Sequence, residues 1–169
     1  MKLFVASDHA GYKIKTDLLN NLVLHDIEIV DLGCDDETSI DYPDYAKKLC
    51  KAVVNEKNSK GILICGTGIG MSMAANKMPN IRAALCFNTT MAHFAREHND
   101  ANVLCFGARI VGPEVIKEMV DLFINTEFSY GRHKKRVDKI EGMNEEKDDD
   151  SFDALAQQLE RDLKDIEID

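Results

Sequence analysis

Short runs of apolar residues alternate along the chain with longer segments in which apolar residues recur every three or four positions. The apolar runs cover residues 2–6, 27–32, 61–65, 81–86 and 102–106. The intervening segments have the apolar spacing of helices, as at Val115, Met119 and Leu122. Strands separated by helices form βαβ units, in which parallel strands are covered by helices on both faces. The pattern predicts an α/β fold: a three-layer, doubly wound (Rossmann-like) domain around a five-stranded parallel sheet.

The periodic pattern ends near residue 143, where the charged segment NEEKDDDS begins. Residues 144–169 hold eleven acidic and three basic side chains, so they carry −8 of the chain's net charge of −9. We therefore expect one domain over residues 1–142 and an acidic C-terminal extension over 143–169, helical or partly disordered.

An apolar stripe runs through this extension. Its members recur at intervals of three and four and are Phe152, Leu155, Leu159, Leu163 and Ile166. This spacing places them on one side of a helix, for which Ser151 can act as the N-cap. Such a helix can pack on the body of the protein or on another subunit. A frayed, solubilising terminus is the alternative interpretation.

The composition excludes several classes of protein. The remaining body carries only −1, without the broad basic face that a phosphate backbone requires, so nucleic acid is not expected as a partner. No apolar run reaches the length of a bilayer span, and the start MKLFVASDH lacks the features of a signal peptide. The five cysteines are odd in number and form no CxxC pair, which indicates reduced thiols. We expect a cytoplasmic protein without a membrane partner.

Polar residues at the ends of the first and third apolar runs indicate a ligand site. Asp8 and His9 follow the first run, and Cys65 ends the third. Because ligands of doubly wound proteins bind at the carboxyl ends of the strands, these residues should share one edge of the sheet. After Cys65, the segment GTGIG lets backbone N–H groups approach an anion, and the following helix adds its positive end. The segment lacks the spacing of a dinucleotide fingerprint and the Lys-Ser/Thr ending of a P-loop. A thiol acting as base or nucleophile on a small phosphorylated ligand is therefore favoured.

Each of these features also has a structural interpretation. Cys65 could be an inert core residue, as we expect for Cys86 and Cys105, which end apolar runs without a glycine loop behind them. The Asp-His pair could simply cap the first helix. The basic cluster GRHKKR at 131–136 could be a solvated helix face, although it is compact enough to hold a single phosphate.

Taken in order, six segments resemble the successive signatures of one enzyme family. They are SDHAGYKIK (7–15), DYPDYA (41–46), GILICGTGIGMSMAANK (61–77), IRAALC (81–86), EHNDANVLCFGARIVG (97–112) and GRHKKRV (131–137). Together they look like those of the B-type ribose 5-phosphate isomerases, whose family also includes allose 6-phosphate and galactose 6-phosphate isomerases. The resemblance runs from residue 1 to about residue 142 and covers nothing of the acidic extension.

The resemblance implies an aldose-ketose isomerase of the pentose phosphate pathway, which interconverts ribose 5-phosphate and ribulose 5-phosphate through an enediolate without metal or organic cofactor. It implies Cys65 as the base and His98 as the acid that opens the sugar ring. It implies that Thr67 and the amides of the glycine loop stabilise the enediolate oxygen. Some relatives carry a glutamate base on this loop where this chain has Met71, so Cys65 is the base candidate here.

The same resemblance implies a set of substrate-binding residues. These are Asp8, His9, Tyr42, Gly66, Gly68, Ile69, Gly70, Asn99, Arg109, Arg132 and Arg136. The aspartate and histidine would contact sugar hydroxyls or the phosphate end, the tyrosine would line the pocket, and the asparagine would hold the enediolate or a hydroxyl. The three arginines would bind the phosphate, whose geometry suits guanidinium groups. Two of them are four residues apart and so lie on one face of a helix.

The order of the elements separates the two principal catalytic candidates. A helix predicted over 89–97 leaves the carboxyl end of the fourth strand and returns to the opposite edge, so His98 should lie at the amino ends of the strands. Cys65 should lie at the carboxyl ends, a strand length away, on the order of 17 Å. One subunit therefore cannot easily bring His98 to its own Cys65. We predict a homodimer, or a dimer of dimers, with active sites shared between subunits.

Three alternatives stay open. An isomerase for a six-carbon sugar phosphate would differ only in the length of its pocket. A non-catalytic phosphosugar-binding module of the same fold would not need a base such as Cys65. A nucleotide- or flavin-binding protein would require an acidic ribose ligand after the second strand in a fingerprint context, which this chain lacks.

Overall fold

The computed structural model describes residues 1–22 and 26–143 of the chain. Within these ranges, five strands form one parallel sheet in the order β2-β1-β3-β5-β4. The strands are β1 Lys2–Ser7, β2 Glu28–Asp31, β3 Ser59–Cys65, β4 Ala83–Leu85 and β5 Val103–Gly107. The predicted α/β fold is confirmed, and each apolar run contains or overlaps one of these strands.

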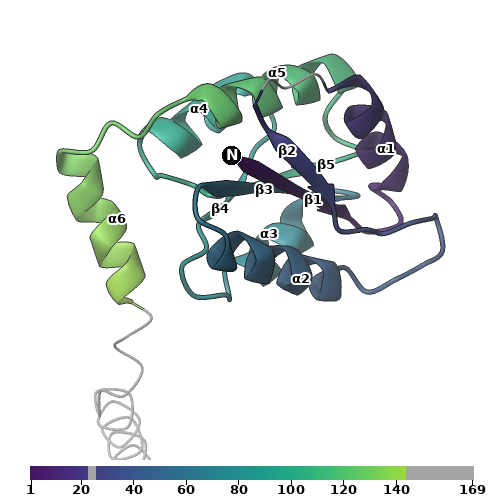
Figure 1. Cartoon of the computed structure of the whole chain (residues 1–169), viewed down its shortest axis with the longest axis horizontal. Helices are drawn as coiled ribbons and strands as arrows, with labels where there is room; N and C mark the ends of the chain where they lie inside the picture. Colours follow the sequence, from purple (N-terminus) through teal and green to yellow (C-terminus); the bar gives the residue numbers. More distant parts are fainter. Residues whose placement is uncertain (23–25, 144–169) are drawn as a thin grey trace, which may run out of the picture. The chain divides into compact units, whose positions relative to one another are not determined.

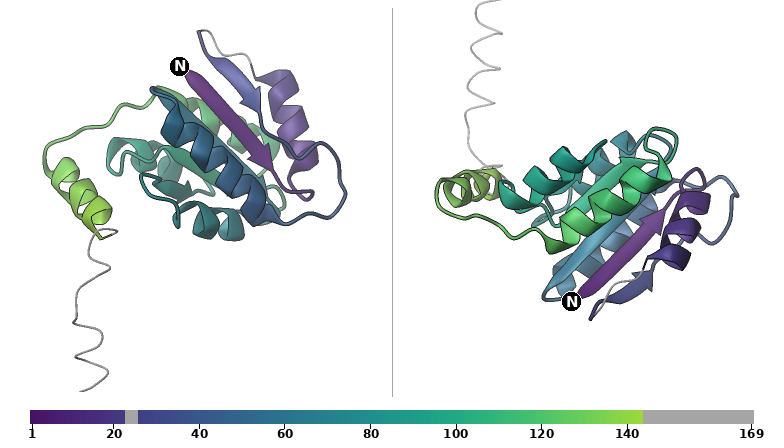
Figure 2. Two further views of the ribbon diagram at one scale, coloured as in Figure 1. Left: turned by 60° about the horizontal axis from the view of Figure 1, so that its bottom comes forward. Right: turned by 90° about the horizontal axis from the view of Figure 1, so that it is seen from above.

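Helices cover both faces of the sheet (Figure 1 and Figure 2). They are α1 Tyr12–Asn21, α2 Tyr42–Asn55, α3 Ile69–Ala75, α4 Thr89–Glu97 and α5 Pro113–Asn125, and α6 Arg132–Gly142 follows them. On one face lie α1, α4 and α5, and on the other lie α2 and α3. This is the three-layer arrangement that the alternating pattern predicts.

The period of two along each strand divides the buried residues between two cores. On β3, Ile62 and Ile64 face the core under α1, α4 and α5, whereas Leu63 and Cys65 face the core under α2 and α3. Successive side chains of a strand point to opposite faces, so a strand buried on both faces is apolar throughout. This explains why the apolar runs are continuous rather than alternating.

The helix between the fourth and fifth strands has the predicted bounds. Before its first residue, Asn88 is extended, and its side chain accepts a hydrogen bond of 2.9 Å from the N–H of Met91. This N-cap satisfies a backbone donor that would otherwise lack a partner. The helix ends at Glu97, so the residues that follow it return to the amino ends of the strands.

An ion pair with a buried lysine joins α1 to the end of β2. The side chain of Lys15 is only 1 % exposed, and its Nζ lies 2.6 Å from both carboxylate oxygens of Asp31. The carboxylate also accepts a hydrogen bond from the N–H of Gly33. A buried cation requires such pairing, because loss of its hydration is otherwise uncompensated. The sequence analysis did not identify this pair, since the two residues are sixteen positions apart on different elements.

The topology opens a crevice between β1 and β3. From β1 the chain passes through α1 to β2 on one side of the sheet, and from β3 it passes through α3 to β4 on the other. Neighbouring strands whose connections diverge leave a gap at their carboxyl ends, where doubly wound proteins bind their ligands. Asp8 and Cys65 both lie at this point, since the N–H of Asp8 donates to the carbonyl of Ile64.

The chain divides into two units, Met1–Val137 and Asp138–Asp169, and α6 crosses from one to the other. The predicted division near residue 143 stays a prediction. The apolar stripe of the acidic extension and its N-cap, Ser151, lie outside the described residues.

Candidate active site

Cys65 is the last residue of β3, and its side chain is only 5 % exposed. Its Sγ accepts a hydrogen bond of 3.1 Å from the N–H of Gly68, which turns the glycine loop back over the thiol. An N–H donor directed at the sulfur stabilises negative charge on it. The turn requires glycine at position 68, because φ is +80° and an added Cβ would lie 2.7 Å from the carbonyl carbon of Phe106.

Three side chains surround the rest of this loop. Thr67 is exposed, and its Oγ1 accepts a long hydrogen bond of 3.4 Å from the N–H of Ile69. Tyr42, the first residue of α2, packs so closely on Gly70 that an added Cβ there would lie 2.6 Å from its ring. The guanidinium of Arg109 extends over Gly66, with Nη1 3.3 Å from the position of an added Cβ.

Asp8 and His9, which follow β1, make local hydrogen bonds and also line the candidate site. Asp8 is buried, and its Oδ1 accepts a hydrogen bond of 3.0 Å from the N–H of Gly11 ahead of α1. His9 accepts a hydrogen bond of 3.3 Å at Nδ1 from the N–H of Ile40. An acceptor at Nδ1 places the proton of the neutral ring on Nε2. The aspartate therefore does close a turn before the helix, while both side chains also line the cleft beside Cys65.

These residues enclose a cleft of about 490 Å³. The residues that line it are Asp8, His9, Ala10, Tyr42, Cys65, Gly66, Thr67, Ile69, Gly70, Met73 and Arg109. This volume lies in the range of small-molecule sites. Nine of the residues proposed from the sequence thus meet in one place, and we call them, with Ala10 and Met73, the Cys65 half-site. Gly68 is buried beneath the loop, and Met71 is fully buried in the core under α2 and α3.

The other predicted site residues do not line this cleft. His98 follows α4, and the next residues run along the amino edge of the sheet. There Asp100 binds the side chains of Arg96 and Arg82, the latter directly before β4. Asn99 is exposed in the same turn. Arg132 and Arg136 lie one turn apart in α6, both exposed.

His98 lies in a stack of three rings. Its imidazole packs between Phe94, at a centroid distance of 4.6 Å, and His133, at 4.2 Å with the two imidazole planes only 5° apart. Arg132 Nε donates a hydrogen bond of 3.4 Å to Nε2 of His133, and Glu97 Oε2 lies 3.5 Å from Nε2 of His98. We call the group His98, Asn99, Arg132, His133 and Arg136 the His98 half-site.

Sequence reasoning missed His133, although it stands between two residues that were proposed. Partial desolvation, together with the nearby His98, Arg132 and Arg136, lowers the pKa of His133, and Glu97 opposes this shift. The only available signal was its position inside GRHKKR, which does not reveal which ring it contacts.

Buried thiols elsewhere behave as core residues, as predicted for Cys86 and Cys105. Burial raises the pKa of Cys50 and of Cys86 to about 12, and it raises that of Cys105 well above its ordinary value. None of the five cysteines forms a disulfide bond.

Comparison with known proteins identifies the family. The family model for ribose/galactose isomerases matches residues 3–140. The chain belongs to the ribose/galactose isomerase family. Its relatives include ribose-5-phosphate isomerase B of Escherichia coli, which is 42 % identical over 139 residues. The aligned residues cover 82 % of this chain and 93 % of that protein.

Solved structures agree with this assignment. Ribose-5-phosphate isomerase B of Clostridium thermocellum superimposes with a TM-score of 0.82 at 45 % identity, covering 86 % of this chain and 98 % of that one. Type B ribose 5-phosphate isomerase of Trypanosoma brucei gives a TM-score of 0.81 at 42 % identity, covering 84 % and 97 %. The chain is therefore an isomerase, and the family match ends before the acidic extension.

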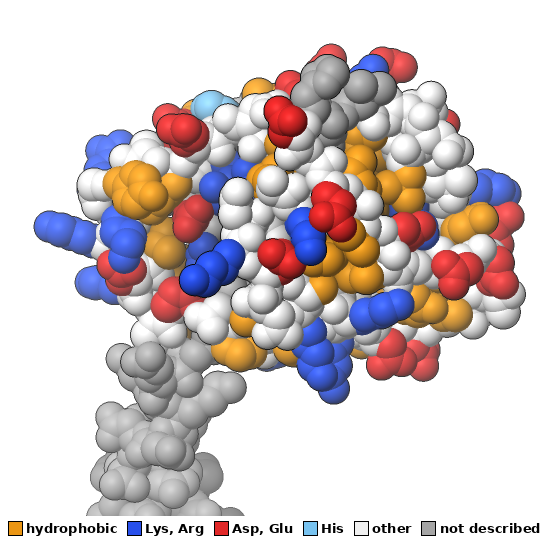
Figure 3. Space-filling model, in the orientation of Figure 1, with side chains coloured by type: hydrophobic (Ala, Val, Ile, Leu, Met, Phe, Trp, Pro, Cys, Tyr) orange, Lys and Arg blue, Asp and Glu red, His pale blue; other side chains and the backbone are white. Residues whose placement is uncertain are grey.

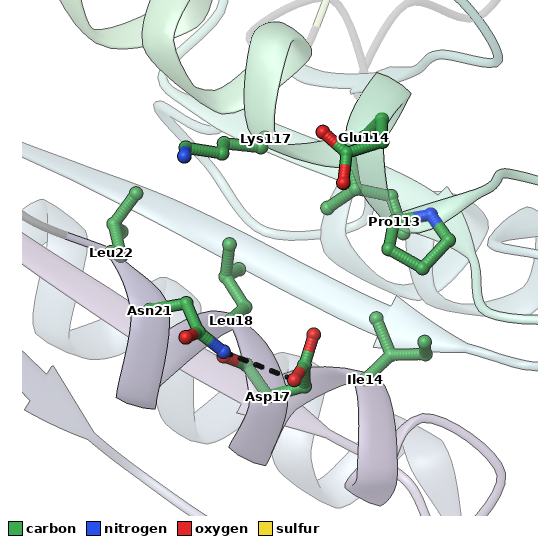
Figure 4. A pocket seen from close by; sticks show the side chains of 9 residues that line it. Ile14, Asp17, Leu18, Asn21, Leu22, Pro113, Glu114 and Lys117 are labelled. Carbon is green, nitrogen blue, oxygen red and sulfur yellow. Dashed lines mark hydrogen bonds between the residues drawn. The ribbon is translucent and has the colours of Figure 1, made fainter.

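A second hollow in this family member lies between α1 and α5 (Figure 4). It has a volume of about 320 Å³, and its lining residues are Ile14, Asp17, Leu18, Asn21, Leu22, Pro113, Glu114, Ile116 and Lys117. Asn21 donates to the Asp17 carboxylate at 3.0 Å on the α1 side, while Glu114 and Lys117 line the α5 side. This hollow contains neither a thiol nor a histidine, so the cleft beside Cys65 is the candidate active site.

Three further observations on the described residues concern metal ligands, membrane spans and surface charge. Across 1–22 and 26–143, no three His, Cys, Asp or Glu side chains gather as a metal site would require. No helix in the same ranges has both the length and the apolar character of a membrane span. On the face shown in Figure 3, Lys and Arg side chains lie interspersed with Asp and Glu side chains.

Proposed function

We propose that this chain interconverts ribose 5-phosphate and ribulose 5-phosphate, with Cys65 as the base. The observation that carries the proposal is the thiol at the end of β3, which lines the cleft and accepts an N–H from its own glycine loop. The names of the relatives support the substrate, and the position of the thiol supports its role as the base. The unpaired cysteines suit a reducing compartment, which supports a cytoplasmic location.

The reaction begins with ring opening, because the sugar phosphate is mostly cyclic. The bond between C1 and the ring oxygen breaks, and its electron pair goes to the ring oxygen, which takes a proton from His98. The C1 hydroxyl loses its proton to solvent, and C1 becomes the aldehyde carbon. A histidine suits this step because imidazoles commonly act as general acids and bases in enzymes.

The isomerisation then transfers a proton between adjacent carbons. The Cys65 thiolate removes the proton from C2, the C2 electron pair forms a C1–C2 double bond, and negative charge moves to O1. The glycine loop and Thr67 line the cleft, and their amides and hydroxyl would donate to this oxygen. The thiol returns its proton to C1, while O1 gains a proton and O2 loses one, giving the ketone at C2. Ring opening breaks one C–O bond and the other steps are proton transfers, so the proposed chemistry uses no metal and no organic cofactor.

The substrate-binding residues divide between the two half-sites. In the Cys65 half-site, Asp8 and His9 would contact sugar hydroxyls or phosphate, and Arg109 would bind the phosphate. In the His98 half-site, Asn99 would hold a hydroxyl or the enediolate, and Arg132 and Arg136 would complete the phosphate site.

A homodimer would bring the two half-sites together. The His98 half-site of one subunit would complete the cleft beside Cys65 of the other, and twofold symmetry would create two such sites. Exposed apolar side chains on α4 and just before it support this proposal: Phe87, Met91 and Phe94 are 43 %, 37 % and 41 % exposed. Burial of these side chains against a second copy would contribute to the free energy of association.

The decisive experiment is a substrate comparison with the purified full-length protein. Ribose 5-phosphate, allose 6-phosphate and galactose 6-phosphate are assayed side by side, with and without a chelator. We expect the highest kcat/KM for ribose 5-phosphate and no effect of the chelator. Preference for a six-carbon substrate would change the proposed substrate and leave the proposed reaction, aldose-ketose isomerisation, unchanged. Binding without turnover of any of the three would indicate a phosphosugar-binding module.

A further inference from the structure

Two aromatic rings stack on the imidazole of His98, and the ring of His133 is the nearer of the two. The two imidazoles are parallel within 5° at 4.2 Å, and Phe94 covers the opposite face of His98 at 4.6 Å. His98 is therefore held on both faces, although its side chain is 36 % exposed. A partly exposed side chain without such contacts would exchange between several rotamers.

The polar contacts of the stack differ between the two histidines. Arg132 Nε can only donate, so Nε2 of His133 accepts and carries no proton. Nε2 of His98 instead lies 3.5 Å from the carboxylate of Glu97, and the same carboxylate lies 3.1 Å from Nε2 of His93. Arg132 and Arg136 are the cations near His133. The ring of His133 is thus neutral, while His98 faces a carboxylate.

We propose that His133 is a positioning residue, which holds the imidazole of His98 in the orientation required for opening the sugar ring. The inference rests on the proposed function, in which His98 gives a proton to the ring oxygen. His133 does not touch the reacting atoms in this proposal. It stacks on His98 as a flat, uncharged surface, so that His98 can be protonated without an adjacent parallel cation.

The proposal makes the role of His133 specific to one step. Ring opening requires a correctly oriented His98, whereas proton removal by Cys65 does not. Ribulose 5-phosphate offers a direct separation, because its C2 carbonyl and phosphorylated O5 leave it in the open-chain form. Exchange of its C1 proton with deuterated water requires bound substrate and Cys65 but no ring opening, whereas turnover of cyclic ribose 5-phosphate also requires the proton from His98.

The test uses the full-length enzyme and the variants His133→Ala, His133→Phe and, as a matched control on the same helix, Lys135→Ala. We measure kcat and KM for ribose 5-phosphate, deuterium exchange at C1 of ribulose 5-phosphate, and inhibition by inorganic phosphate. We expect His133→Ala to lower kcat about tenfold, the upper scale for loss of an aromatic pair, with exchange and phosphate inhibition within about twofold of wild type. His133→Phe, which keeps a flat ring, should recover most of kcat, and Lys135→Ala should match wild type.

Other results would overturn the proposal. Unchanged kcat in His133→Ala would show that the stack does not position His98. Equal loss of phosphate inhibition in the Ala and Phe variants would make His133 a phosphate ligand instead. The NMR resonances of the His98 ring provide a readout independent of activity, since ring-current shifts should be lost in His133→Ala and kept in His133→Phe. If wild type isomerised no sugar phosphate, the proposed function would fail, and these shifts would still show whether His133 holds the ring.

Discussion

The two half-sites are built in different ways. The Cys65 half-site is a cleft at the carboxyl ends of β1 and β3, and backbone geometry shapes it: a glycine with φ of +80° and an N–H directed at the thiol. The His98 half-site is a surface cluster at the end of α4 and the start of α6, and side-chain stacking shapes it. In the proposed mechanism, the first would provide a cleft and a base, and the second would provide an acid and two arginines. Neither would then be a complete site by itself.

Removal of the proposed base should have the largest effect. We expect Cys65→Ala to lower kcat by at least about a hundredfold, with substrate binding largely kept, since a positioned base contributes on this scale. Cys86→Ala is the matched control, because that thiol also ends an apolar run but lies in the core. Isotope exchange into substrate and steady-state kinetics check the result. Near-full turnover of Cys65→Ala would exclude the thiol as base.

Complementation tests whether the half-sites come from different subunits. Cys65→Ala and His98→Ala are each inactive in the proposed mechanism, and the two proteins are unfolded together and refolded. Random pairing makes about half of the dimers mixed, each with one intact site, so about a quarter of wild-type activity should return. Mass spectrometry of the intact assembly must show mixed dimers. Their presence without recovered activity would mean that each subunit builds its own site.

Glycine substitutions test the claim that backbone shapes only the Cys65 half-site. Gly68→Ala places a Cβ within 2.7 Å of backbone at φ of +80°, so the loop must shift, and we expect at least about a tenfold loss of kcat/KM. Gly131→Ala is the control, because φ is +54° but the space around it is open. It should cost only about 1 kcal/mol of stability and keep activity. Similar kinetic losses in both variants would contradict the comparison.

Unfolding at alkaline pH tests whether the Cys86 thiol is buried in the folded core. Burial raises the pKa of Cys86 from 9.0 to about 12, so between these values the unfolded chain loses a proton that the folded chain keeps. The stability that this group contributes is fully present below pH 9 and is lost as the pH rises toward 12. We expect Cys86→Ala to reduce the slope of unfolding free energy against pH by up to about 1.4 kcal/mol per unit. Denaturant titrations across this range measure the slope, and an unchanged slope would show that Cys86 ionises in the folded state.

The acidic extension should have the smallest effect on catalysis. Truncation after Met143 leaves every residue of both half-sites in place, so kcat and KM should stay unchanged. If the extension packs as an amphipathic helix, the truncated protein should differ from the full-length protein in the number of subunits of its assembly or in Tm. Analytical ultracentrifugation and calorimetry decide this. The same number of subunits and the same Tm in both proteins would favour a solubilising terminus.

The sequence predicted the elements well because their signals are local. Strands and helices follow from apolar spacing over a few residues, and the helix 89–97 was found with its predicted bounds. The Cys65 half-site was equally accessible, since Asp8, His9 and the glycine loop directly follow strands that the topology places side by side. In the His98 half-site, the roles of four residues were proposed only from a resemblance, apart from the edge at which His98 lies, and His133 was not proposed.

By itself, the sequence determined the α/β fold, the edge of the sheet that holds Cys65, and the glycine positions of its loop. These depend on periodicity and backbone conformation, which a single segment encodes. The tertiary structure alone decided which side chains meet across the chain: Lys15 with Asp31, Tyr42 with Gly70, and His98 with His133. Such contacts depend on how separate elements pack and which rotamers that packing allows. Spacing along the chain carries no record of that packing.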